Sequence, residues 1–91
     1  MNNALGIINY FNLTAEQFDK LTTQQIDILG YIYEFDSISP MEAFADLNIT
    51  KLSTRVSEMR VIGIQFDQNY ECRKNRHGKN VRFMRYRRKA A

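Results

Sequence analysis

Three segments in the first two thirds of the chain repeat their apolar residues every three or four positions, which is the spacing of one face of a helix. In the first of these segments the repeat is formed by Ile26, Leu29, Ile32 and Tyr33. Thr22 and Thr23 precede it with hydroxyl groups of the kind that begin helices. Gly30 is its weak point, because glycine loses the most conformational freedom on folding. The pattern predicts a helix over residues 24–35.

The second segment opens with a strong helix-start signal. The oxygen of Ser39 can accept a hydrogen bond from an unpaired amide, and Pro40 at the first helical position lacks only an N–H that would be unpaired anyway. Glu42, three residues after the serine, completes a capping box. The apolar side of this predicted helix carries Met41, Phe44, Ala45 and Leu47.

The third segment follows after a very short turn. Asn48 tolerates the left-handed conformation that ends many helices, so the chain can reverse within few residues. We expect Thr50 to cap the next helix, over residues 51–62, and Gly63 to end it. The apolar stripe of this helix consists of Leu52, Val56 and Met59. Two helices joined by so short a turn form a helix-turn-helix.

Beyond Gly63 the apolar residues change to a period of two, which predicts strands. The first strand is expected over residues 64–71, with Ile64, Phe66 and Gln68 on its inner side. The second, over residues 80–88, sets Val81, Phe83, Met84 and Tyr86 against outward-facing Arg82, Arg85 and Arg87. The basic stretch CRKNRHGKN joins the two strands, so they form a β-hairpin of the kind called a wing. The lone apolar Ile38 predicts a very short further strand.

The predicted fold class is therefore α+β. We expect a winged helix-turn-helix with a three-helix core, a C-terminal β-hairpin wing and a short N-terminal extension. The extension is assigned to residues 1–22 and the winged domain to residues 23–89. In the extension the apolar residues have no clean period, but Thr14 and Gln17 form a capping-box pattern that predicts a short helix over residues 15–21.

Charge is divided sharply along the chain. Residues 1–72 hold four basic residues against ten acidic ones, a net charge of −6, whereas residues 73–91 hold nine basic residues and no acid, a net charge of +9. Such a concentration of cations repels itself unless a polyanion neutralises it, so it indicates a nucleic-acid partner. The alternative is a solubilising tail, but this stretch includes a predicted strand.

Several kinds of chemistry are disfavoured by the composition. Cys72 and His77 are the only residues of their types, so neither an intrachain disulfide nor a zinc cluster is expected. We expect no cofactor and no enzymatic activity, because the sequence has no Gly-rich phosphate loop and no cysteine–histidine pair in which the histidine is oriented by a third group. No signal peptide or apolar run of membrane-spanning length is visible, so a cytoplasmic protein with no membrane contact is expected.

The third helix and the wing are the candidate DNA-binding surfaces. On a helical wheel, Ser53, Thr54, Ser57 and Val61 face away from the apolar stripe. A Ser/Thr surface is more often only solvated, but the neighbouring basic hairpin favours a role in binding.

For Arg55 an ion pair with Glu58 or Glu42 and a phosphate contact are about equally favoured, whereas Arg60 is a better candidate for the DNA backbone. Tyr70 and Tyr86 are interpreted as core residues. The residues expected to contact DNA are Lys51, Ser53, Thr54, Arg55, Ser57, Arg60, Arg73, Lys74, Arg76, His77, Lys79, Arg82, Arg85 and Arg87.

Residues 23–86 resemble the small winged helix-turn-helix domains common in phages and prophages. The resemblance is carried by a glutamine near the start of the first helix, by ISPMEA, by LNITKL with RVSEMR, by Gly63, and by a Gly-Lys wing that leads to Tyr86. It implies binding to double-stranded DNA in a viral regulatory setting, such as transcription, recombination or replication control. The alternative is a phage-encoded interaction module, or an inhibitor of a bacterial nucleic-acid enzyme, on the same scaffold.

Partners and assembly stay open at this level. A bacterial host protein is a second possible partner, and either a monomer or a homodimer would suit DNA binding. The extension has three alternative roles, namely packing on the domain, dimerising it, or binding a host protein.

Overall fold

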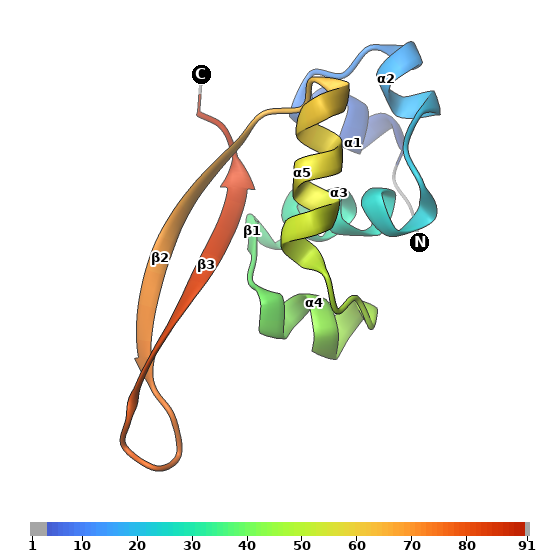
Figure 1. Cartoon of the computed structure of the whole chain (residues 1–91). Helices are drawn as coiled ribbons and strands as arrows, with labels where there is room; N and C mark the ends of the chain where they lie inside the picture. Colours follow the sequence, from blue (N-terminus) through green and yellow to red (C-terminus); the bar gives the residue numbers. More distant parts are fainter. Residues whose placement is uncertain (1–3, 91) are drawn as a thin grey trace.

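The computed structural model describes residues 4–90 as five helices and three strands (Figure 1). In chain order these are α1 (Ala4–Phe11), α2 (Ala15–Asp19), α3 (Thr23–Phe35), β1 (Ser37–Ile38), α4 (Pro40–Leu47), α5 (Leu52–Ile62), β2 (Phe66–Lys74) and β3 (Asn80–Arg88). The order from α3 onward matches the predicted winged helix-turn-helix, and the α+β class is confirmed.

Local hydrogen bonds explain where most helices begin and end. The capping boxes predicted at Thr14 and Ser39 both form, and Thr22 forms a further one with Gln25. Asn48 adopts the left-handed conformation, with φ of 58°, and closes α4. Gly63 does the same after α5, with φ of 109°.

The prediction that Thr50 caps α5 is wrong. The cap position is taken by Lys51, whose carbonyl accepts the first helical hydrogen bond, from the amide of Arg55 at 3.1 Å. Lysine has no side-chain oxygen to accept an amide, so α5 begins without a side-chain cap.

The core lies between α3, α4 and α5, and β1, β3 and the start of β2 complete it. Its fully buried large side chains are Ile7, Ile28, Leu29, Ile32, Ile38, Val56 and Met59. The buried stripe of α3 differs slightly from the predicted one, because Ile28 replaces Tyr33, which packs against Tyr10 nearer the surface. The Tyr31 hydroxyl donates to Asp46 at 2.6 Å and so ties α3 to α4; this bond is the main reason that the pKa of Tyr31 is raised to about 12.

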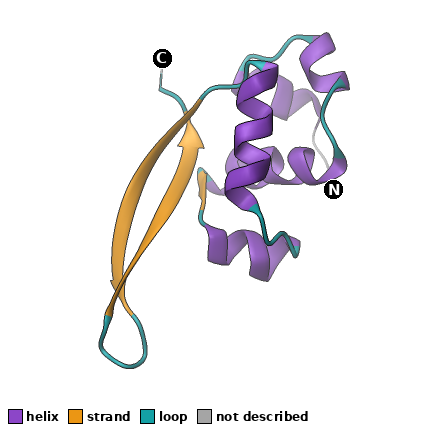
Figure 2. Ribbon diagram, viewed as in Figure 1, coloured by secondary structure: helices purple, strands orange, loops and turns teal. Residues whose placement is uncertain are grey.

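The three strands form one antiparallel sheet in the order β1–β3–β2. Ile38 pairs with Tyr86, so the very short strand predicted at Ile38 is confirmed. The hairpin β2–β3, which we call the wing, projects past the helices (Figure 2). One face of its base packs on the core through Phe66 and Tyr86. Val81, which was expected to point inward, is 42% exposed because the outer part of the wing leaves the core.

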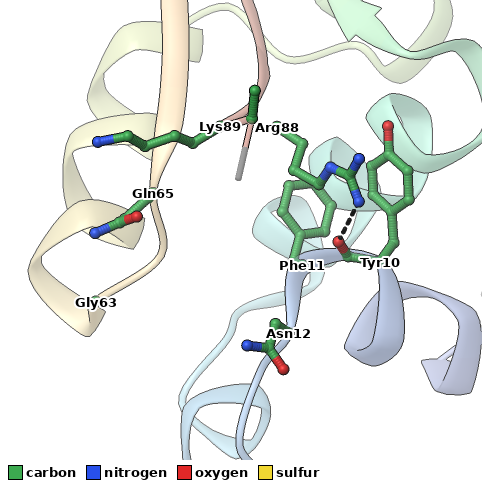
Figure 3. A pocket seen from close by; sticks show the side chains of 8 residues that line it. Tyr10, Phe11, Asn12, Gly63, Gln65, Arg88 and Lys89 are labelled. Carbon is green, nitrogen blue, oxygen red and sulfur yellow. Dashed lines mark hydrogen bonds between the residues drawn. The ribbon is translucent and has the colours of Figure 1, made fainter.

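The N-terminal extension packs on the winged domain. Ile7 of α1 is completely buried, and the rings of Tyr10 and Phe11 contact Tyr33 and Phe66. Arg88 at the end of β3 lies over the Tyr10 ring and donates from Nη1 to the Tyr10 carbonyl at 3.1 Å (Figure 3). Residues 4–22 of the extension therefore pack on the winged domain and contact the end of β3.

Replacing Gly30 with alanine is expected to raise the free energy of unfolding by about 0.5–1 kcal/mol, because alanine is a better helix former. The added methyl would meet only Ile7 Cδ1, at an ordinary contact distance of 3.5 Å. Gly63→Ala is the matched control: its φ of +109° and a contact of 2.9 Å to Gln17 Nε2 predict a loss of about 1–2 kcal/mol. Urea titration measures both, and a destabilised Gly30→Ala variant would contradict this account of α3.

Candidate nucleic-acid interface

The outer face of α5 carries only small side chains. Leu52, Val56 and Met59 are buried, while the four residues on the opposite side are exposed, namely Ser53, Thr54, Ser57 and Val61. The orientation predicted from the helical wheel is therefore confirmed. Val61 is 89% exposed, so an apolar side chain stands in solvent beside the hydroxyl groups.

Arg55 lies on the flank of α5 and is held there by an ion pair. Its Nη2 lies 3.4 Å from Glu58 Oε2, and the other oxygen of Glu58 accepts a hydrogen bond from Gln25 Nε2 at 2.9 Å. Of the two uses left open for Arg55, the structure shows the ion pair. Its Nε is buried and has no hydrogen-bond partner among residues 4–90.

Arg60 braces the base of the wing. Its Nη2 donates to Gln68 Oε1 at 2.6 Å and its guanidinium lies 5.9 Å from the centre of the Phe66 ring. Sequence reasoning did not foresee this contact, although Gln68 is only eight residues away along the chain. The residue is nevertheless exposed, at the edge of the outer face of α5.

The tip of the wing is a tight turn built by Asn75. The Asn75 side-chain oxygen accepts from the amides of His77 and Lys79, and Gly78 takes the left-handed conformation with φ of 78°. The turn is shorter than the predicted loop, because β2 runs on to Lys74 and β3 starts at Asn80. All basic side chains from Arg73 to Lys79 are exposed, and none of them forms an ion pair within residues 4–90.

Arg73 and Arg82, in the outer part of the wing, lie against aromatic rings. The Arg82 guanidinium is 3.7 Å from the centre of the Tyr70 ring, and that of Arg73 is 5.7 Å from Phe83. Such contacts hold a cation in place without neutralising it. Tyr70 is 57% exposed, so its interpretation as a core residue was wrong, whereas Tyr86 is buried as expected.

Arg85 is not on the outward face where it was expected. Only 9% of the residue is exposed, and its guanidinium reaches Glu42 and Glu71, both at 2.9 Å, and Ser37 Oγ at 3.0 Å. Burial alone would lower the pKa of Arg85, but the bond to Glu71 and the charge of Glu42 outweigh it, so this pKa is raised. Arg85 thus joins β3 to α4, β2 and β1.

Arg87, the next outward-facing residue predicted on β3, forms a more exposed ion pair. Its Nη1 lies 3.4 Å from Asp36 Oδ2, at the end of α3. More than a third of the Arg87 side chain stays accessible to solvent, so it keeps part of its surface for another contact.

A helix-turn-helix followed by an antiparallel hairpin, with a third helix behind, defines the class of winged helix-turn-helix proteins. A family model described as a winged helix-turn-helix domain matches residues 23–87, and the chain belongs to that family. Domains of this class typically bind DNA and lack enzymatic activity of their own. Neither the search of curated proteins nor that of solved structures found a significant match.

Two further observations concern residues 4–90. None of their helices combines the length and the apolar character needed to cross a bilayer. No group of three or more His, Cys, Asp or Glu side chains in this range is placed to hold a metal ion.

Proposed function

We propose that this protein is a DNA-binding regulator, with α5 in the major groove and the wing on the phosphate backbone. The observation that carries the proposal is the row of exposed, unpaired cations from Arg73 to Lys79, on a hairpin whose base is braced against the exposed helix α5 by Arg60. Arg55, Arg85 and Arg87 form ion pairs with acids, whereas the cations from Arg73 to Lys79 form none, so their charge is not neutralised within the described chain. Phosphates would neutralise it.

In the major groove, the small side chains of α5 allow close approach. The hydroxyls of Ser53, Thr54 and Ser57 can bond to base edges or phosphates, and the methyls of Val61 can touch a thymine methyl. The amides of the first turn of α5 have no side-chain cap, and together with Lys51 they favour a phosphate at that end.

On the wing, the proposed contacts come from the tip and from the outer strand. Arg73, Lys74, Arg76, His77 and Lys79 would follow the phosphates, with Arg82 and Arg87 nearer the base. Arg60 stays in the proposed set because it is exposed. Arg55 and Arg85 are assigned to the scaffold instead, because their guanidinium groups already serve internal ion pairs.

The setting we propose is transcription or recombination control by a phage or prophage, in the cytoplasm of the host cell. The support for it is the likeness of ISPMEA and LNITKLSTRVSEMR to phage domains of this class. The protein would act as a monomer or a homodimer.

Ser57→Glu tests the placement of α5. A carboxylate on this exposed face would meet the phosphates and base edges of the groove, so we expect affinity for duplex DNA to fall by about tenfold or more. Leu5→Glu adds the same charge at an exposed site on α1 and is expected to change affinity by less than about twofold. Fluorescence anisotropy measures both variants, and equal affinities would contradict the placement of α5 in the groove.

A further inference from the structure

The wing and the start of α4 enclose a cleft of about 470 Å³, and two of the proposed DNA contacts, Arg73 and Lys74, line it. Its walls are largely apolar: Pro40 and Met41 come from α4, and Val81 and Phe83 come from β3. Met41 is 76% exposed and Val81 is 42% exposed. Neither side chain belongs to the core, so both leave apolar surface of the cleft exposed to solvent.

Charge around this cleft is one-sided. Arg73 and Lys74 line it and form no ion pair within the described chain. The carboxylate that lines it, Glu42, is bound by Arg85 at 2.9 Å. An incoming carboxylate would therefore meet two free cations and no free acid.

The register of the wing places the cleft on a face of its own. Arg73 pairs with Val81, and Glu71 pairs with Phe83, so these residues share one face of the hairpin. Tyr70 and Arg82 belong to the other face, together with Gln68, which contacts Arg60 of α5. The cleft thus opens beside α4, mainly on the face of the hairpin opposite to that braced by α5. Lys74, which alternation places on the other face, lines the cleft from the end of β2.

We propose that this cleft is a docking site for an acidic, amphipathic segment of a partner protein. One large apolar side chain of the segment would enter between Met41 and Phe83, and neighbouring carboxylates would pair with Arg73 and Lys74. The chemistry favours a peptide over a second stretch of nucleic acid. An apolar wall offers no hydrogen-bond donor or charge to a phosphodiester, whereas it can bury the side chain of a leucine or phenylalanine. Because Arg73 and Lys74 are also proposed phosphate contacts, a docked segment would compete with DNA for these two cations.

The test uses the full chain and a panel of short fluorescein-labelled peptides in which leucine and phenylalanine are interspersed with aspartate and glutamate. We expect binding that weakens by about tenfold or more when the acids are changed to lysine, or when the apolar residues are changed to alanine. Met41→Glu and, separately, Val81→Glu are expected to weaken binding of the acidic peptides by about tenfold. Phe44→Glu is the matched control, because Phe44 is an exposed residue of the same helix outside the cleft, and it is expected to change affinity by less than about twofold.

Thermal unfolding checks that all three variants keep the fold, and duplex binding is measured separately, so failure of the docking site and failure of DNA binding are distinguishable. The proposal is overturned if no acidic peptide binds, if the lysine peptides bind as well, or if Met41→Glu and Val81→Glu bind like the wild type. Self-association in sedimentation velocity that Met41→Glu abolishes would also overturn it, because the occupant would then be a second copy of this chain.

Discussion

Replacing Arg85 with alanine is expected to lower the free energy of unfolding by about 2–3 kcal/mol. Truncation leaves Glu42 and Glu71 without the cation that links them, and losing one partner of a buried pair costs about 3–5 kcal/mol. We expect a loss at or below the bottom of that range, because the two carboxylates are 36% and 31% exposed and water stabilises them in part. Urea unfolding monitored by circular dichroism measures the change.

The matched control for this variant is Arg87→Ala, which removes an arginine two residues away on the same strand. Its pair with Asp36 is more exposed than that of Arg85, at 37% and 74%, so the expected loss is below about 1 kcal/mol. Hydrogen exchange adds a local readout: amides of β2 and β3 should exchange faster in Arg85→Ala, because the bond that fixes the wing to α4 is gone. Equal stabilities of the two variants would contradict the scaffold role of Arg85.

Changing Arg73, Lys74 and Arg76 together to alanine is expected to reduce duplex affinity by about a hundredfold at low salt. Each lost phosphate contact should also lower the slope of the logarithm of the binding constant against the logarithm of salt concentration by about one unit. All three side chains are exposed and outside every ion pair of the described chain, so stability should hardly change. Anisotropy titrations at several salt concentrations measure both quantities.

Loss of net charge alone can weaken DNA binding, so a charge-matched pair accompanies the triple variant. Arg76→Ala and Lys20→Ala each remove one positive charge, but Lys20 lies after α2 beside Glu16, far from the wing along the chain. We expect a lower salt slope for Arg76→Ala and an unchanged slope for Lys20→Ala. If both behave alike, or if the triple variant keeps its affinity, the wing does not bind phosphate.

The helix-turn-helix could be predicted from the sequence because its signals are local. The hydroxyl of Ser39, the proline after it and the left-handed Asn48 each satisfy or end a helix through neighbours within four residues. The outward face of α5 could be predicted because its buried residues, Leu52, Val56 and Met59, form one apolar stripe. The wrong prediction at Thr50 has a local cause too. Thr50 lies one position before the cap residue Lys51, and the sequence alone does not show which of the two positions begins the helix.

What the sequence could not supply depends on contacts between distant segments. Arg85 reads as an outward-facing cation, and only the approach of α4, more than forty residues away, turns it into a buried bridge. Helix α1 was not predicted, and the contacts that hold it, with Phe66 and Arg88, come from segments more than fifty residues away along the chain. Tyr70 alternates like a core residue, but it falls where the hairpin has already left the core.

DNA binding by this protein is tested most directly by an anisotropy titration of the purified wild-type chain with random duplex DNA at several salt concentrations, followed by selection of preferred sequences. A DNA-binding regulator is expected to bind duplex DNA with an affinity that falls steeply as salt rises, and to enrich one sequence motif. Binding that is weak, insensitive to salt and without enrichment would contradict a DNA-binding regulator.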